Sequence, residues 1–277
     1  DPGHPNYFAL KSMMQMNHEI EEILHCPLKG KPGPGVVRPD TVLSQNGFHA
    51  HEFNVSWPGG VADTDIIMGT LAQNTLFKNF RQQLNLQGLD IILPEHNLSC
   101  RLLLEELIDT AGKARPFIAL VHPRPYSPTG QDLHLAEYLR DSILEAGHDC
   151  ALIFPDQLEM IGHTPRFEGR EIDVVYRFFE WHHVQQDPGF LGYRRILRAA
   201  MNGDLAVVNS FSSEALSAKS VFEILWDNEL SQIFDSNVVG QIRHHIPQTF
   251  NLAKADQNDL GMLIEEKDHW VVKPVKG

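Results

Sequence analysis

Two short apolar runs on either side of an amphipathic segment constrain the fold of this chain most strongly. Residues 117–121 (FIALV) and 150–154 (CALIF) are unbroken apolar runs, and residues 131–146 between them carry apolar side chains at helical spacing. Unbroken apolar strands are typical of parallel sheets, whose two faces are covered by helices. Gly147 follows the amphipathic segment, and glycine commonly ends a helix. The sequence therefore predicts a strand, a helix and a second, parallel strand.

The same alternation continues toward the C-terminus. It predicts strands at 173–176 and 205–208, and helices at 191–201 and 214–225. Residues from about 115 to 210 are therefore expected to form an open, Rossmann-like α/β sheet. Ligands of such sheets bind at the carboxyl ends of the strands, which makes one group of residues candidates for a cleft. This group is His122, Arg124, Pro155, Arg177, Asn209 and Ser210.

Helices are also predicted in the first 114 residues. Residues 7–24 carry apolar side chains at helical spacing and are followed by Pro27. Residues 74–86 and 102–114 have apolar stripes of the same kind, on either side of the apolar segment 90–94. We expect three helices in this part of the chain.

A polar hairpin is predicted between the first two of these helices. Side chains two apart on a strand leave the same face, so Glu52 and Asn54 should point together. The turn sequence 45–47 (QNG) can bring Asp40 to the same place. Carboxylate and amide oxygens suit Mg²⁺ bound to phosphates, and Arg38 lies beside them. In an equally simple interpretation, Asp40 is a turn residue, Glu52 a solvated position and Asn54 a cap.

Several short motifs resemble one family in their order along the chain. They are RPD at 38–40, Gly47, EFN at 52–54, the pair Gly59-Gly60, and WVVKPVKG at 270–277. This order is similar to that of the circularly permuted ATP-grasp ligases, among them the synthetase domain of glutathionylspermidine synthetase and its uncharacterised relatives. In ordinary ATP-grasp enzymes the lysine-bearing strand precedes the carboxylate and amide metal ligands. Here it follows them, as circular permutation implies.

The resemblance also covers the middle of the chain, more loosely. Residues 172–181 (IDVVYRFFEW) and 208–226 are similar to family segments. The family implies an α/β (α+β) fold, with a permuted ATP-grasp part beside an open pre-ATP-grasp sheet domain. The expected divisions are 1–114 for the first helix and the metal-binding strands, 115–212 for the sheet domain, and 213–277 for the start of a truncated nucleotide lobe.

The family resemblance also implies roles for individual residues. Asp40, Glu52 and Asn54 would hold Mg²⁺, and Arg38 would act in catalysis on the transferred phosphoryl group. Lys219 and Lys273 would contact the phosphates of ATP. The reaction would join a small-molecule or peptide carboxylate to an amine through an acyl phosphate.

The sequence around these residues also predicts how exposed they are and which partners they have. Lys219 falls on the helix predicted at 214–225, where a lysine is ordinarily solvated. Lys273 lies between valines on a strand that should be half buried, where it needs a partner such as a phosphate oxygen. Arg177 and Glu180 follow a buried strand. They line the active cleft in the related synthetases, or else pair with each other.

Two other functions remain open. The chain could be a catalytically idle ATP-grasp-like module that binds a nucleotide or a peptide, since its sequence ends where a glycine-rich phosphate loop would begin. It could also be an unrelated Rossmann-type enzyme. That second alternative ranks last because the chain has no G-x-G-x-x-G after a strand and no G-x-x-x-x-G-K-[ST].

The composition limits the kinds of binding partner and the cellular compartment that we expect for this protein. A net charge of −13 without a basic cluster argues against nucleic acid. No apolar run reaches the roughly 18 residues that a membrane span needs. Three scattered cysteines favour a reduced, cytoplasmic protein. The pairs His182-His183 and His244-His245 are not expected to bind metal, because adjacent side chains diverge.

Overall fold

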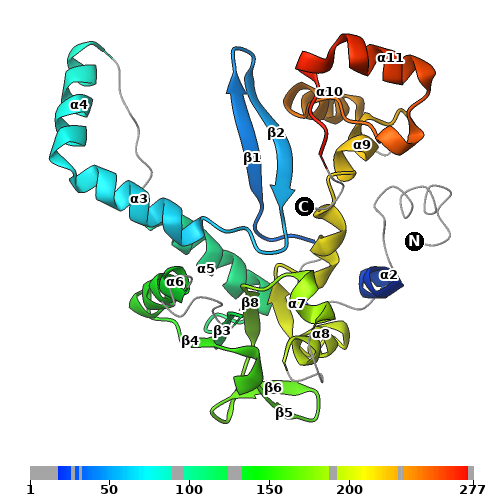
Figure 1. Cartoon of the computed structure of the whole chain (residues 1–277). Helices are drawn as coiled ribbons and strands as arrows, with labels where there is room; N and C mark the ends of the chain where they lie inside the picture. Colours follow the sequence, from blue (N-terminus) through cyan, green and yellow to red (C-terminus); the bar gives the residue numbers. More distant parts are fainter. Residues whose placement is uncertain are drawn as a thin grey trace. The chain divides into compact units, whose positions relative to one another are not determined.

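The chain folds into two compact units (Figure 1). A computed structural model describes residues 18–25, 29–30, 33–88, 97–123, 133–186, 192–229, 232 and 234–273. One unit, called the hairpin unit below, takes Asp1–His25, Val37–Val55 and Ser212–Gly277. The other, called the sheet unit, takes Cys26–Val36 and Ser56–Phe211. Residues 56–114 thus belong with the sheet, whereas the sequence divisions placed them with the hairpin.

A parallel sheet forms the centre of the sheet unit, as the sequence predicts. Its strands, in the spatial order β4-β3-β8-β9, are β4 (Cys150–Ile153), β3 (Ile118–Val121), β8 (Val174–Arg177) and β9 (Ala206–Val208). All three pairings are parallel. Every residue of β3, β8 and β9 is buried, which explains their unbroken apolar sequences.

The order of the strands determines which face of the sheet each connecting helix covers. The connection from β3 to β4 and the connection from β8 to β9 run in opposite directions along the sheet. Because crossovers between parallel strands are almost always right-handed, their helices must cover opposite faces. Figure 1 shows α6 (His134–Glu145) and α8 (Tyr193–Met201) on opposite sides of the strands. The fold is therefore doubly wound, with its switch point between β3 and β8.

The remaining helices of the sheet unit are α3 (Val61–Gln73), α4 (Thr75–Leu86), α5 (Leu98–Ala111) and α7 (Trp181–Gln185). The helices predicted at 74–86 and 102–114 correspond to α4 and α5, whereas α3 was not predicted. Segment 90–94 lies outside the described residues. Leu103, Leu104 and Leu107 of α5 pack in the core with the strands and α6.

A small antiparallel sheet follows β4 and was also not predicted. It contains β5 (Glu159–Ile161), β6 (Thr164–Phe167) and β7 (Arg170–Glu171), after the short 3-10 helix η2 (Pro155–Gln157). Its strands have two to four residues, which is too short for a clear alternation of apolar and polar side chains.

The hairpin unit is built around β1 (Arg38–Ser44) and β2 (Gly47–Asn54), which pair antiparallel through the predicted turn. Its helices are α2 (His18–His25), α9 (Val221–Trp226), α10 (Ser236–His245) and α11 (Gln257–Glu265), with the 3-10 helices η3 (Phe211–Leu216), η5 (Leu252–Lys254) and η6 (Lys267–His269). The helix predicted at 214–225 is wrong, because η3 and α9 are separated by a turn. Only the end of the helix predicted at 7–24 lies within the described residues, as α2.

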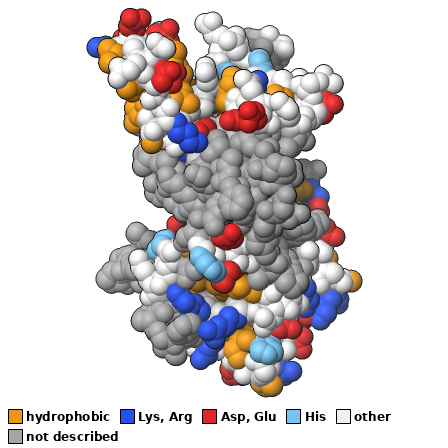
Figure 2. All heavy atoms as spheres, turned by 90° about the vertical axis from the view of Figure 1, so that its right-hand side faces the viewer, with side chains coloured by type: hydrophobic (Ala, Val, Ile, Leu, Met, Phe, Trp, Pro, Cys, Tyr) orange, Lys and Arg blue, Asp and Glu red, His pale blue; other side chains and the backbone are white. Residues whose placement is uncertain are grey.

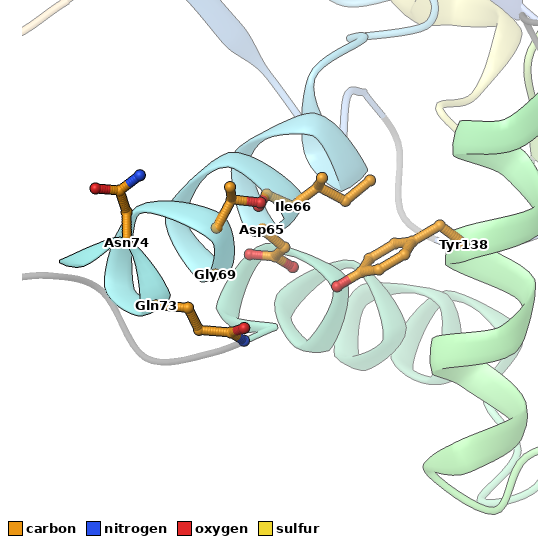
Figure 3. Close-up of a pocket in the computed structure, with 7 residues that line it drawn as sticks. Asp65, Ile66, Gly69, Gln73, Asn74 and Tyr138 are labelled. Atoms are coloured by element: carbon orange, nitrogen blue, oxygen red, sulfur yellow. The ribbon is translucent and has the colours of Figure 1, made fainter. Parts of the chain in front are cut away.

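Asp65 of α3 supplies the N-terminal cap of α5. Its carboxylate accepts hydrogen bonds from the main-chain N–H groups of Ser99 and Cys100, at 3.1 and 2.8 Å. Asn97, the residue at the cap position, makes no capping bond with its own side chain, which instead accepts from Tyr138 of α6 at 2.7 Å. Figure 3 shows Tyr138 pointing toward Asp65 across a pocket of about 470 Å³. Asp65 thus joins α3 to α5, and its carboxylate is committed to structure.

We predict that Asp65→Ala lowers the free energy of unfolding by about 2 kcal/mol, because two helix N–H groups, one of them buried, lose their acceptor. Urea denaturation measures this change. The control is Glu105→Gln on α5, an exposed carboxylate that lies 3.5 Å from solvent-exposed Arg101. This change should cost under about 0.5 kcal/mol. Equal, small effects of both changes would contradict the capping role.

Candidate functional site

The register of the hairpin brings the four residues predicted on it to one face. Asp40 lies opposite Glu52, and Arg38 lies opposite Asn54. Paired residues of neighbouring strands share a face, and so do residues two apart. The Asp40 carboxylate accepts from Arg38 Nε and from Asn54 Nδ2, both at 3.2 Å. The structure thus assembles these side chains, whose functional roles stay a prediction.

A β-bulge adds His49 to the same face. The register shifts between Asp40 and Thr41, so that Thr41 pairs with Ala50, Asp40 pairs with Glu52, and His51 is the extra residue. By simple alternation, His49 would face away from Glu52. With the bulge, His49 pairs with Val42, which lies two residues from Asp40. Bulges re-aim side chains in this way and are frequent beside functional sites.

Lys219 reaches this face from the hairpin unit's C-terminal segment. It lies in the turn just before α9, not on a helix as predicted. Its Nζ atom is 3.1 Å from Glu52 Oε1, and its side chain is only 15% exposed. The expectation of a solvated helix lysine is therefore wrong. The turn aims the ammonium group at the carboxylate.

Lys273 lies beside the hairpin as well. Its Nζ atom is 3.0 Å from His51 Nδ1. The predicted half-buried strand is not formed at residues 271–273, and the side chain of Val271 is 78% exposed. Lys273 is therefore an exposed lysine at the end of the described chain. Val275, the third valine of the prediction, lies outside the described residues.

A pocket of about 840 Å³ connects these elements within the hairpin unit. Its walls come from the hairpin, the start of α9, the segment 247–252 and the segment 269–273. Its polar and charged lining residues include His49, His51, Lys219, Ser220, Glu223 and Lys273. Its aromatic lining residues are Phe222, Phe250 and Trp270, besides its histidines. Apolar walls with a few convergent charges are typical of small-molecule sites.

The charge of the whole chain does not attract an anion to this pocket. The net charge is −13, and Figure 2 shows acidic and basic side chains together on one face of the molecule. Any phosphate group in the pocket would have to be held by local cations, and Lys219 and Lys273 are cationic residues of its lining. Among the described helices, none is long and apolar enough to cross a bilayer.

The donor set of the hairpin face fits Mg²⁺ better than a transition metal. No group of three or more His, Cys, Asp or Glu side chains that could hold an ion occurs in the described part of the chain. Asp40, Glu52 and Asn54 offer only two carboxylates and one amide oxygen, which is fewer protein ligands than such a group would supply. This number is sufficient for Mg²⁺, because Mg²⁺ usually keeps several waters and takes phosphate oxygens as further ligands. In the present contacts Lys219 and Arg38 compensate the two carboxylates.

The carboxyl edge of the parallel sheet is occupied by the protein itself. Asn209 accepts from Val36 N at 2.8 Å and donates to Val36 O at 2.6 Å, and Ser210 Oγ donates to Gly33 O at 3.1 Å. His122 and Pro155 are buried too, and Arg124 lies outside the described residues. His122, Pro155, Asn209 and Ser210 are thus buried and do not face an open cleft. Their polar groups tie the segment 33–36 to the sheet.

Arg177 is part of this sealed edge. Its side chain is 0% exposed, and its guanidinium donates to the carbonyl oxygens of Asn209, Phe179 and Ser210 at 2.7, 3.3 and 3.5 Å. A substrate cannot reach it in this conformation. Glu180 is exposed at the start of α7 and lies 3.3 Å from His182. The role of both residues in a substrate cleft stays a prediction.

Within each of the two histidine pairs, the rings lie closer together than we expect of adjacent side chains. The rings of His182 and His183 have centroids 3.9 Å apart, and those of His244 and His245 are 4.8 Å apart. The Glu180 N–H donates to His183 Nδ1 at 3.1 Å, which caps α7. Burial, followed by the neighbouring His182, lowers the pKa of His183 to about 4. His183 is therefore a neutral structural residue at pH 7.

The described cysteines are poor nucleophiles. Cys100 is buried and Cys150 is half-buried, and neither forms a disulfide. Burial raises the pKa of each thiol to about 12, with Asp65 adding to the effect at Cys100. The thiolate is the reactive form, so neither residue suits covalent catalysis.

Comparison with known proteins supports the fold only. No family model and no curated protein matches the chain. Among solved structures, it is similar to the apo form of a glutathione synthetase-like effector from Globodera pallida, with 14% sequence identity and a TM-score of 0.56. The match covers 87% of this chain and 55% of the effector, so the chain spans about half of that protein. The chain thus has a mixed α/β fold related to that of glutathione synthetase-like proteins.

We predict that the protein loses stability as the pH falls from about 6.5 toward 4. His183 keeps its neutral form in the folded state, whereas in the unfolded state it binds a proton below its ordinary pKa of 6.5. This contribution is complete above pH 6.5. Thermal melting across this window should show a shallower fall for His183→Gln, which keeps an acceptor for the Glu180 N–H but does not titrate.

The matched control is His134→Gln, an exposed histidine on α6 that lies 3.2 Å from Glu137. It should leave most of the acid destabilisation in place. An unchanged pH profile for His183→Gln would show that His183 is not the group responsible.

Proposed function

We propose that the chain is an ATP- and Mg²⁺-dependent carboxylate–amine ligase that makes an amide bond through an acyl phosphate, similar to glutathionylspermidine synthetase. One observation carries the proposal. Lys219 and Lys273 line one pocket of the hairpin unit, and Lys219 is in contact with the face that bears Asp40, Glu52 and Asn54. Cations for phosphate and oxygen ligands for Mg²⁺ thus converge, although they come from opposite ends of the sequence.

Each side chain has a role that follows from its charge and position. Asp40, Glu52 and Asn54 would hold Mg²⁺, after the Asn54 amide rotates so that its oxygen replaces the Nδ2 group that now donates to Asp40. The bound ion would neutralise phosphate charge. Lys219 and Lys273 would contact the phosphates of ATP, because their flexible ammonium groups suit a shifting set of oxygens.

Arg38 would act on the reacting group. Its guanidinium is permanently charged and planar, so it can bind two oxygens of the transferred phosphoryl group or of the acyl phosphate. The substrate carboxylate attacks the γ-phosphorus and ADP leaves, and the amine then displaces phosphate from the acyl carbon. Such a reaction needs positioning and charge neutralisation more than it needs a general base.

The order of the motifs supports a permuted ATP-grasp arrangement. The metal-side hairpin precedes the lysine-bearing segments in the sequence, yet all of them belong to one compact unit. The doubly wound sheet unit then corresponds to the pre-ATP-grasp domain of the resemblance. A fold likeness at 14% identity to a glutathione synthetase-like protein is in keeping with this assignment.

A second candidate function is a catalytically idle module that binds a nucleotide or a peptide. Arg177 is sealed inside the sheet unit, although the resemblance gives it a place in the substrate cleft. The similar solved structure is moreover described as an effector. In such a module the pocket would still bind Mg·ATP, but an acid and an amine would cause no release of phosphate.

We predict that Glu52→Ala weakens the binding of Mg·ATP by at least about 100-fold, because the metal loses a carboxylate ligand. Isothermal titration calorimetry with and without Mg²⁺ measures the effect. Glu265→Ala, an exposed carboxylate of the same unit, is the control and should bind as the wild type does. Metal-dependent binding that survives in Glu52→Ala would remove the hairpin as the metal site.

Phosphate release then separates the two functions. The ligase should release phosphate from ATP when peptide acids and amines are supplied together. Binding without any such turnover across a broad substrate panel would favour the idle module.

Lys219→Met should change the affinities for two ligands in opposite directions. It frees Glu52 from its ion pair, so Mn²⁺ alone should bind about fivefold more tightly, while Mg·ATP loses a phosphate contact and should bind more weakly. Manganese relaxation and calorimetry measure the two affinities. Lys267→Met, exposed in η6, should change neither. Weakening of both ligands by Lys219→Met would contradict this arrangement.

A further inference from the structure

Helix α4 of the sheet unit has an apolar stripe that the described structure covers only in part. Leu76, Phe80 and Leu84 follow one another at intervals of four residues, so they lie along one side of the helix. Phe77 lies beside them. No residue of α4 is buried, and Leu76 is 79% and Phe80 is 54% exposed. An amphipathic helix of a globular protein normally buries such a stripe against the core. The stripe of α4 therefore offers a surface to a partner.

The rest of the sheet unit gives α4 little support. Among the described elements, α4 packs mainly against the preceding helix α3, and Figure 1 shows it projecting away from the strands of the sheet. The helix has 12 residues. Its first turn is capped, because the Asn74 side chain accepts from Phe77 N at 3.1 Å. Even a capped helix of this length is marginal in water without packing, so α4 gains stability from a further contact.

The charge of this segment differs from that of the rest of the chain. The chain has 36 acidic and 23 basic residues, yet no acidic residue occurs between Asp65 and Asp90. The charged residues of α4 are Lys78 and Arg81, and its other polar side chains are neutral. A helix with an apolar stripe and only positive charges matches the helices that lie in the interface of an anionic bilayer.

From this match we propose that α4 docks onto an anionic lipid surface. The helix lies in the plane of the interface, and Leu76 and Phe80 enter the boundary between headgroups and acyl chains. Arg81 is four residues after Phe77, at the margin of the stripe, where its long side chain reaches lipid phosphates. Lys78 lies farther round the helix and adds to the attraction of the surface.

The charges of α4 favour a bilayer over a second copy of the chain. In a two-fold pair the same patch meets itself, so two helices that carry only positive charges would face each other. An anionic bilayer instead supplies phosphates for the cations and an apolar layer for the stripe. The bilayer also repels carboxylates elsewhere in the chain. This repulsion is largely screened beyond about 8 Å at physiological salt, and α4 projects from the body of its unit.

The test is co-sedimentation of the full chain with vesicles of phosphatidylcholine, with or without added phosphatidylglycerol. The anionic vesicles should bind at least about tenfold more tightly than the neutral ones. Phe80→Ser removes an apolar anchor and should weaken binding at least about tenfold, and Lys78→Gln should weaken it about fivefold. Leu144→Ser, at a leucine of α6 that is 45% exposed, is the matched control and should change nothing.

Equal binding to both kinds of vesicle, or no binding to either, would overturn the proposal, and neither result depends on a variant. Binding that Phe80→Ser leaves unchanged would also overturn it. Sedimentation without lipid provides a further check, since a dimer that Phe80→Ser dissociates would assign the stripe to a second copy. Thermal melting confirms that each variant is folded. Glu52→Ala should bind vesicles as the wild type does, because the docking helix and the proposed metal site belong to different units.

Discussion

The candidate site depends on the antiparallel pairing of β1 with β2. This pairing sets Asp40 against Glu52 and Arg38 against Asn54, so two carboxylates, an amide and a guanidinium share one face. The bulge at His51 then turns His49 to that face, opposite Val42. A slip of one residue would send one strand's polar residues to the opposite face, and a slip of β2 would leave Lys219 without its carboxylate partner. The short turn at Gln45-Asn46 therefore determines which side chains share a face along the whole hairpin.

Lys219 is held by this arrangement and in turn stabilises it. Two carboxylates on a hairpin face would repel each other without nearby cations. Arg38 compensates Asp40 and Lys219 compensates Glu52, at 3.2 and 3.1 Å. Under the proposed function, Mg²⁺ and phosphate would meet charges that the protein already pairs. Their binding would exchange one set of charge pairs for another.

The sequence predicts those parts of the fold that local patterns determine. Buried parallel strands are apolar throughout, so residues 117–121 and 173–176 could be recognised, and the turn sequence 45–47 predicted the hairpin. It could not predict the bulge or the turn at Lys219, because both depend on contacts between distant segments. Nor could it show that Asn209 binds Val36, 173 residues earlier in the chain. Polar residues at the strand ends therefore looked like a cleft but serve to close the sheet.

The closed sheet and the open pocket differ in what they offer a ligand. In doubly wound folds the switch point between β3 and β8 would be the first place to look. There the donors of Arg177 are already spent on main-chain carbonyls, and Asn209 is bonded to Val36 through both its oxygen and its nitrogen. The hairpin unit has a pocket of about 840 Å³, and its lining includes Ser220, Glu223 and Trp270, each with a buried polar atom that has no partner among the described residues. A ligand gains most where polar groups are unsatisfied, and that condition favours the pocket beside α9 over the edge of the sheet.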